Sequence, residues 1–317
     1  MSTIEVRVAA KVCEAEGICS YELVPLDGAP LPPFDAGAHI DVHVGNEHVR
    51  QYSLCNAPHE THRYLIGVLR DAGSRGGSLA MHEKVDAGSV LTISAPRNHF
   101  PLVDAARTLL IAGGIGVTPI LAMAEALAAK GAAFEMHYCV RSPEHAAFRE
   151  RLAASGFSRQ VHFHYDSGDA AQKLDLSVLL AAPSDQHLYV CGPSGFIGYV
   201  LASARAHGWP DAQLHVEYFS GAVIDTAGDR PFDVKLASSG QVLRVPAGRT
   251  VIQVLAEQGI DVPYSCEEGV CGTCLTRVLD GVPDHRDLYL TEEEQAANDQ
   301  FTPCCSRAKT SLLVLDI

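Results

Sequence analysis

The first hundred residues alternate short apolar stretches with turns. These stretches are rich in β-branched residues, several alternate apolar and polar positions, and Gly, Pro, Asp and Asn separate them: IEVRVAAKVC, AHIDVHV, VRQYSLCN, RYLIGVLR and VLTISAP. A period of two is typical of strands with one buried face. Because no long amphipathic helix interrupts them, the pattern predicts an antiparallel β-barrel domain over residues 1–103.

From residue 104 the pattern changes to buried strands that alternate with helices. RTLLIAGG is an apolar run that enters a glycine turn, and TPILAMAEALAAKG has the composition of a helix ending at Gly131. Strands are then expected at FEMHYCV, VHFHYD and HLYVCGP, and helices at SPEHAAFRERLAASG, LDLSVLLAA and SGFIGYVLASARAHG. This alternation predicts an α/β domain with a parallel sheet over residues 104–222.

The last part of the chain mixes strands and helix around a group of cysteines. Residues 218–231 are rich in Gly, Ser, Asp and Pro without strong periodicity, which indicates a linker. Residues 232–317 then offer a hairpin, FDVKLASSGQVLRVP, a helix, TVIQVLAEQG, the cysteine loop and a closing strand, SLLVLDI. These elements predict a third domain of the α+β class.

Composition places the chain among ordinary folded proteins. Its 317 residues suit two or three domains, and 47% of them are hydrophobic while 20% are charged. We expect no membrane partner and a cytoplasmic location, because the sequence has no apolar run of about 18 residues and no signal peptide. The net charge of −14 argues against nucleic-acid binding, which needs a basic surface.

Four of the ten cysteines have a spacing that suits a metal centre. Cys266, Cys271, Cys274 and Cys304 form the pattern C-x4-C-x2-C-x29-C. Zinc sites usually pair two short knuckles, whereas three ligands from one loop and one distant ligand are typical of a plant-type [2Fe–2S] centre. Zinc or purely structural cysteines remain alternatives.

The loop sequence itself strengthens the cluster interpretation. PYSCEEGVCGTC, with two glycines that allow a tight bend, resembles the plant-type ferredoxin domain. In that family the last ligand precedes a small-residue stretch with an Arg. The resemblance therefore favours Cys304 over its neighbour Cys305 as the fourth ligand.

A second motif indicates a nucleotide. LLIAGGIGVTPIL contains Gly113, Gly114 and Gly116 in a strand–turn–helix arrangement, where free helix N–H groups attract a pyrophosphate. Tight strand–helix packing would also explain these glycines, since the G-x-G-x-x-G fingerprint is absent.

With YVCGPSGF, this motif resembles the nicotinamide domain of ferredoxin–NADP reductase relatives. The resemblance implies that Thr118 lies beside a flavin and that Cys191, Gly192 and Pro193 border the nicotinamide ring; a core role for Cys191 is the alternative. Arg141 and Ser142 follow the second strand, where the cofactor ribose is expected. These two residues do not distinguish NADH from NADPH, and the resemblance to the family favours NADH.

A third motif suits a flavin. In VRQYSLCNAP, Arg50 can pair with a phosphate, Tyr52 can pack on the ribityl chain or ring, and Ser53 can hydrogen-bond near the reactive nitrogen. Further along, a glycine- and serine-rich stretch can form an N–H cradle for phosphate: Arg75, Gly76, Gly77 and Ser78. Structural strand residues and an exposed loop are the alternatives.

The order of these motifs, with PRNHFPL after them, resembles the phthalate dioxygenase reductase family over essentially the whole chain. FTPCCSRA and DHRD (284–287) are similar to its vanillate demethylase reductase branch. The resemblance implies a flavin-binding barrel that holds FMN, an NAD-binding domain and a β-grasp ferredoxin domain. It also implies that Phe219 of HVEYFSG, two residues after Glu217, stacks on the isoalloxazine ring. An FAD would need adenosine contacts for which the sequence offers no candidate.

The implied function is electron transfer from NADH through FMN and the [2Fe–2S] cluster to a Rieske-type aromatic oxygenase. The residues expected to orient hydride transfer are Ser53, Thr118, Cys191 and Phe219. Residues 229–317 carry 14 acidic and 8 basic side chains, so a basic patch on the oxygenase could dock there, near Glu267 and Glu268. A solvated acidic face is the alternative.

Other functions fit less well or stay open. A different acceptor, such as a cytochrome P450 or a soluble ferredoxin, is not distinguished by the sequence. A non-enzymatic zinc-binding or nucleotide-sensing module would be colourless, whereas flavin and cluster together predict a red-brown protein. A self-contained hydroxylase is disfavoured, because we find no two His and a carboxylate at a plausible spacing for oxygen activation.

Overall fold

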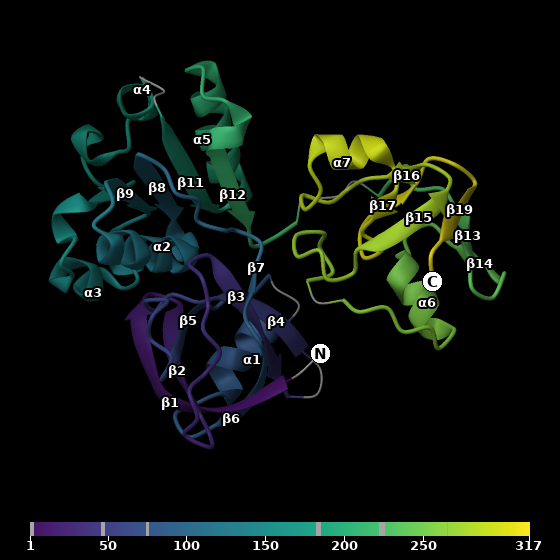
Figure 1. Ribbon diagram of the computed structural model, residues 1–317, viewed down its shortest axis with the longest axis horizontal. Helices are drawn as coiled ribbons and strands as arrows, with labels where there is room; N and C mark the ends of the chain where they lie inside the picture. The colour runs from purple at the N-terminus through teal and green to yellow at the C-terminus, as the bar shows by residue number, and fades with distance from the viewer. Residues whose placement is uncertain (1–2, 46–47, 74–75, 182–184, 222–225, 265) are drawn as a thin grey trace. The chain divides into compact units, whose positions relative to one another are not determined.

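The computed structural model describes residues 3–45, 48–73, 76–181, 185–221, 226–264 and 266–317 (Figure 1). The chain divides into two compact units, Met1–Glu217 and Tyr218–Ile317. The limit expected between the barrel and the α/β domain falls inside the first unit, and the expected linker begins at the limit between the two units.

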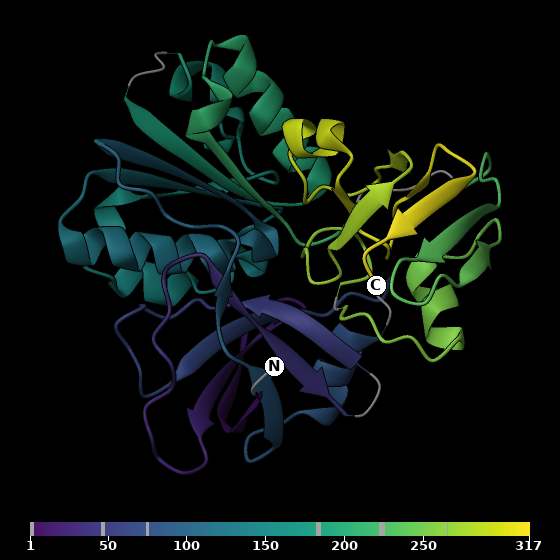
Figure 2. The ribbon, with the colours of Figure 1, turned by 45° about the vertical axis from the view of Figure 1, so that its right-hand side comes forward.

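The first unit begins with the antiparallel barrel that the alternating pattern predicts (Figure 2). Its strands pair in the order β4-β3-β6-β1-β2-β5, with β7 on β3. A bridge between Leu54 and Ile66 closes the gap between the two ends of this order. The elements are β1 (Thr3–Ala15), β2 (Ile18–Pro25), β3 (Ala38–Val44), β4 (His48–Ser53), β5 (Tyr64–Leu69), α1 (Gly77–Lys84), β6 (Val90–Ser94) and β7 (Arg97–Asn98).

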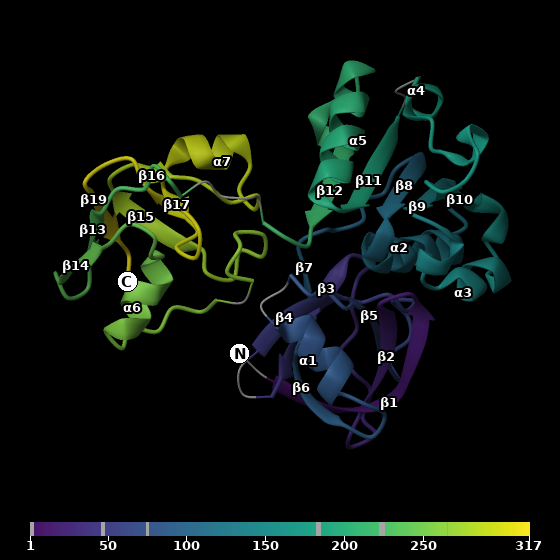
Figure 3. The same cartoon turned by 180° about the vertical axis from the view of Figure 1, so that it is seen from behind.

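The α/β part of the first unit has the expected central sheet, in the order β10-β9-β8-β11-β12 (Figure 3). The pairs β8–β9, β9–β10 and β8–β11 are parallel. The elements are β8 (Arg107–Gly113), α2 (Val117–Lys130), β9 (Phe134–Val140), α3 (Arg149–Ala154), β10 (Val161–Tyr165), α4 (Leu176–Leu179), β11 (Gln186–Gly192), α5 (Ser194–Ala206) and β12 (Leu214–Tyr218).

Both faces of the central strand β8 are buried. Leu110 and Ala112 of β8 belong to the core cluster that includes α2. Leu109 and Ile111, which alternate with them, are buried as well. Since successive strand residues point to opposite faces, apolar material covers the second face too.

Two helices are shorter than the sequence predicts. The stretch SPEHAAFRERLAASG forms a 3-10 turn at Pro143–His145 and then α3 over Arg149–Ala154 only. Phe148 separates the two pieces, because its φ of 57° places it in the left-handed region. In LDLSVLLAA, the described helix is one turn long and begins at the Asp175 cap.

The second unit has the expected α+β organisation. Its main sheet runs β14-β13-β19-β15-β17, and a small β16-β18 ladder lies beside it. The elements are β13 (Phe232–Leu236), β14 (Val242–Val245), α6 (Val251–Glu257), β15 (Thr276–Asp280), β16 (Pro283–Asp284), α7 (Glu292–Ala297), β17 (Gln300–Phe301), β18 (Arg307–Ala308) and β19 (Leu312–Leu315).

Both helices of this unit begin with capping boxes, in which side chain and backbone satisfy each other at the first turn. The apolar face of α6, with Val251 and Leu255, packs into the core formed by the sheet. Within the described residues, no helix has the length and apolar character that crossing a membrane requires.

Candidate functional site

The end of β4 and the start of α1 lie close together in the barrel. Gly76 precedes the helix with a φ of 85°, and among the described residues no side-chain hydrogen bond caps the first turn. A Cβ added to Gly77 would lie 2.5 Å from Arg50 Cγ, so the Arg50 side chain crosses the helix N-terminus. The N–H groups of a helix N-terminus beside a guanidinium suit a phosphate.

The other residues of the expected cradle contribute differently. Ser78 Oγ accepts a hydrogen bond from the backbone N–H of Asp71 at 3.3 Å, which ties the preceding loop to the helix. Arg75, also expected at this site, lies outside the described residues.

Two buried polar atoms near β4 have no hydrogen-bond partner among the described residues: the Tyr52 hydroxyl and His39 Nε2. Tyr52 packs against the barrel core, and burial raises the pKa of its hydroxyl. His39 pairs with Ser53 across β3 and β4, so the two side chains share one face. His39 was not predicted from the sequence, where it is marked only as a polar residue within a buried strand. Such atoms fit a site that a polar cofactor completes.

Ser53 makes a long-range contact with the end of the α/β sheet. Its hydroxyl donates to Glu217 Oε2 at 3.2 Å. Burial raises the pKa of the Glu217 carboxyl to about 8, although the bond from Ser53 favours the charged form. Sequence reasoning used Glu217 only to locate Phe219 and did not place it in the site.

The glycine turn after β8 packs tightly against the Cys-Gly-Pro turn after β11. The two strands are neighbours, with Cys191 opposite Ala112. A Cβ on Gly116 would overlap the Cys191 carbonyl, and one on Gly113 would lie 2.8 Å from the Phe196 ring. Close packing therefore explains these two glycines.

Gly114 differs from its neighbours. Its φ is 54°, and a Cβ there would meet nothing within 4 Å. The side of the turn at Gly114 is thus open, at the carboxyl ends of parallel strands, where nucleotides bind in such sheets. Packing and ligand approach each account for part of the glycine motif.

The remaining nicotinamide-site candidates lie around this turn. The Thr118 hydroxyl donates to the Ile115 carbonyl at 3.1 Å. Cys191 is fully buried in the core cluster, and burial, followed by the charge of Glu217, raises the pKa of its thiol. Gly192 lies against Gly113, and Pro193 precedes α5.

Arg141 and Ser142 follow β9 directly. Arg141 is exposed, and the Ser142 hydroxyl donates to Glu144 at 2.5 Å. Both lie at the carboxyl end of β9, next to β8, which is where the sequence placed the ribose end of the cofactor.

The four cysteine candidates converge in the second unit. The Cys304 thiol interacts with the thiols of Cys266 and Cys274, and Cys266 also interacts with Cys271. The pKa of Cys266 is lowered because Cys271 and Cys304 donate to its sulfur. Backbone N–H groups of Glu268 and Val270 also point at that sulfur, at 3.4 and 3.5 Å.

A donor set made only of thiolates, with backbone amides aimed at sulfur, fits an iron–sulfur cluster. Within the described residues, no three His, Cys, Asp or Glu side chains already surround a single ion position. The residue types and their convergence, rather than a coordination geometry, therefore characterise this site.

Three other candidates belong to the second unit. Phe219 is 40% exposed, and its expected stacking on a flavin stays a prediction. Glu267 is exposed, whereas Glu268 is partly buried and its carboxylate accepts from the Gly221 N–H at 3.1 Å. Of the two acidic residues, Glu267 is thus the better placed to meet a partner.

Comparisons with known proteins agree with this organisation. Residues 234–309 match the family described as "2Fe-2S iron-sulfur cluster binding domain", and residues 97–214 match "Dimethylamine monooxygenase subunit DmmA-like, N-terminal domain". The chain is 57% identical to the vanillate O-demethylase oxidoreductase of Pseudomonas putida, over 99% of this chain and 100% of that protein.

Solved structures are also similar over nearly the whole chain. Phthalate dioxygenase reductase, described as a modular structure for electron transfer from pyridine nucleotides to [2Fe-2S], is 39% identical with a TM-score of 0.77 and covers 100% of this chain and 98% of its own. An intact type IV self-sufficient cytochrome P450 monooxygenase is 41% identical with a TM-score of 0.87 over 99% of this chain, which spans only 41% of that longer protein.

Proposed function

The chain belongs to the phthalate dioxygenase reductase family, and on that premise we propose that it is the NADH-dependent reductase component of a Rieske-type aromatic oxygenase or demethylase. The full-length similarity to a vanillate O-demethylase oxidoreductase, at 57% identity, carries this proposal. We propose a cytoplasmic location, supported by ten free cysteines. The proposed domains are residues 1–103 for FMN, 104–222 for NADH and 232–317 for the cluster.

When bound, the cofactors would supply the redox chemistry, which is hydride acceptance from NADH at the flavin and single-electron transfer at the [2Fe–2S] cluster. The protein binds and orients them. Arg50 and the N-terminal N–H groups of α1 would hold the FMN phosphate, and the Ser53 hydroxyl, positioned by Glu217, would face the reactive edge of the ring. Phe219 would stack on the ring.

The nicotinamide side uses the open turn after β8. Gly114 would let the pyrophosphate approach the backbone, Thr118 and the Cys191–Pro193 turn would border the nicotinamide, and Arg141 with Ser142 would lie at the ribose. No residue is needed as a general base, because hydride transfer depends on the alignment of two rings. Cys266, Cys271, Cys274 and Cys304 would bind the cluster.

The first test separates the flavin from the cluster. Anaerobic titration of the purified protein with NADH should bleach both flavin and cluster absorbance, and extraction should release FMN. A Cys304→Ser variant should lose the cluster but keep NADH-dependent flavin reduction, because Cys304 is none of the proposed flavin or nicotinamide residues and all of those except Phe219 belong to the first unit.

Cys305→Ser is the matched control and should keep the cluster. If Cys304→Ser retained the cluster and Cys305→Ser lost it, Cys305 would be the fourth ligand. A wild-type protein without flavin or iron would contradict the proposed function as a whole.

A cytochrome P450 is the second candidate acceptor, because the chain is similar to part of a self-sufficient P450 monooxygenase. Mixing the reductase with NADH and either a Rieske-type oxygenase or a separate P450 distinguishes the two. We expect NADH-coupled product with the Rieske-type enzyme, and coupling with the P450 alone would reassign the acceptor.

A further inference from the structure

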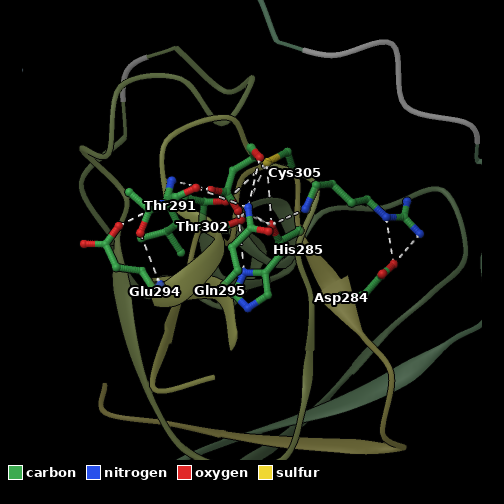
Figure 4. A network of polar contacts seen from close by, with 11 residues as sticks. Asp284, His285, Thr291, Glu294, Gln295, Thr302 and Cys305 are labelled. Carbon is green, nitrogen blue, oxygen red and sulfur yellow. Dashed lines mark hydrogen bonds and ion pairs between the residues drawn. The ribbon is translucent and has the colours of Figure 1, made fainter. Parts of the chain in front are cut away.

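The segment Asp284–Leu290, DHRDLYL, has no part in the functions described so far. In the sequence it lies between the cysteine loop (266–274) and the turn that carries Cys304 and Cys305 (302–306). Figure 4 shows two of its residues, Asp284 and His285, in one network of polar contacts with Thr302 and Cys305. We call these seven residues the clamp segment.

The clamp segment packs directly on the cysteine loop. The Leu288 N–H donates to the Gly269 carbonyl at 3.0 Å. A Cβ on Gly269 would lie 2.9 Å from Asp287 Cα and would overlap the Cys305 sulfur, and one on Gly272 would overlap the Tyr289 ring. Both loop glycines are thus needed for contacts with this segment or with Cys305, in addition to the bend around a cluster.

The same segment also binds the turn that carries the fourth ligand. Ser306 Oγ donates to Asp287 Oδ1 at 3.2 Å and accepts from the Arg286 N–H at 3.1 Å. Thr302 Oγ1 lies 3.0 Å from Ser306 Oγ and 3.3 Å from Cys305 Sγ. Asp287, Thr302 and Ser306 are all buried. The Cys305 thiol therefore lies within a protein hydrogen-bond network, and it also contacts the thiol of its neighbour Cys304.

The Asp287 carboxylate is the centre of these contacts. Its second oxygen accepts from the Leu290 N–H at 2.8 Å. Arg286 turns toward Asp229 and Asp284, at 2.7 and 2.9 Å. Among the described residues, the ion-pair partner of Asp287 is His285, whose Nδ1 lies 3.6 Å from Oδ1 and whose ring nitrogens make no hydrogen bond. Asp287 thus places a carboxylate, buried without an Arg or Lys, against the cysteine loop.

We propose that Asp287 is a positioning residue for the [2Fe–2S] centre. Through Ser306 and Thr302 it keeps the Cys305 thiol in the protein hydrogen-bond network, which leaves Cys304 to face the other three cysteines. The negative charge of Asp287 also lowers the reduction potential of the cluster. The inference rests on the proposed function, because it requires that the loop binds a cluster. A negative charge close to the cluster disfavours an added electron, most strongly where water is excluded.

The charge is tested by Asp287→Asn in the complete holoprotein, with the cluster potential measured by anaerobic redox titration. We expect a shift to higher potential of about 59 mV, which corresponds to a tenfold change in a one-electron equilibrium. Asp284→Asn is the matched control: it removes a carboxylate from the same segment but one that pairs with Arg286, so its potential should stay at the wild-type value.

The positioning is tested by Ser306→Ala. This variant keeps the charge of Asp287 but removes the hydroxyl through which Asp287 is hydrogen-bonded to Thr302. The electron paramagnetic resonance spectrum of the reduced cluster should contain a second species, in which Cys305 replaces Cys304, and the double variant Ser306→Ala/Cys305→Ser should lose that species. Cys305→Ser alone should leave the wild-type spectrum unchanged.

A wild-type spectrum in Ser306→Ala, together with a wild-type potential in Asp287→Asn, would overturn the inference. If Asp287→Asn does not retain the cluster, the Ser306→Ala comparison decides. A wild-type protein without a cluster would refute the proposed function, whereas unaffected variants of a cluster-containing protein would refute only the role of Asp287.

Discussion

Glu217 illustrates how a single side chain depends on its surroundings. Burial raises the pKa of its carboxyl from 4.5 to about 8, so the group is mostly protonated at neutral pH. The unfolded chain would ionise near pH 4.5, whereas the folded chain resists ionisation up to about pH 8. The contribution of Glu217 to the free energy of unfolding is therefore fully present below pH 4.5 and is lost as the pH rises to about 8.

Glu217→Gln should remove this part of the pH dependence, because glutamine keeps an acceptor for Ser53 but cannot ionise. The measurement is the urea midpoint of the cofactor-free protein between pH 5 and pH 9. The exposed residue Glu83 offers a control, Glu83→Gln, which should behave like wild type. An unchanged decline with pH in the Glu217 variant would contradict the burial argument.

At the scale of elements, strands β9 and β10 carry a group of imidazoles on one face of the parallel sheet. His137 stacks on His162 and His164, with ring centroids 5.0 and 5.2 Å apart. Burial, and then the neighbouring His164, lower the pKa of His137 to about 4. Glu135 opposes this shift and itself pairs with Arg107 at 2.5 Å.

Because the folded sheet keeps His137 neutral while the unfolded chain takes up a proton near pH 6.5, the first unit should lose stability as the pH falls from 6.5 to about 4. His137→Gln should flatten this loss, and the exposed His59→Gln should not. Urea unfolding followed at pH 7 and pH 5 measures the difference. Equal losses in all three proteins would show that His137 does not cause it.

Local patterns predicted most elements correctly, since strand alternation and helix caps depend on near neighbours in sequence. The helices that differ from the prediction do so for local reasons that cannot be recognised from residue composition. The expected helix at SPEHAAFRERLAASG breaks at Phe148, because its side chain is buried in the core and its backbone is left-handed. Core packing outweighs helix propensity there.

At the scale of the whole molecule, the net charge of −14 suits a basic partner surface. Long-range attraction between such surfaces raises the association rate and is screened by salt. Glu267 is exposed within the cysteine loop, where a partner must approach to receive electrons.

Raising the salt concentration should therefore slow electron transfer to the oxygenase while leaving NADH reduction of the flavin unchanged. Glu267→Gln should slow the first rate and reduce its salt dependence, whereas Glu83→Gln, on the barrel, should not. Stopped-flow absorbance resolves the two steps. If the rate of electron transfer to the oxygenase does not depend on salt concentration, electrostatic steering is excluded.

The sequence by itself determined the order of the three motifs, the barrel and the parallel sheet, and the loop with three of the proposed cysteine ligands, because each of these depends on residues close together along the chain. Only the tertiary structure brought Ser53 to Glu217, 164 positions away, and the Asp287 carboxylate to Ser306. It also showed that two glycines of the motif differ: Gly116 is required by close packing, whereas the space beside Gly114 is open. Those contacts depend on how separate elements pack, and a hydrogen-bonding side chain gains its role only when folding removes water and leaves one partner within reach.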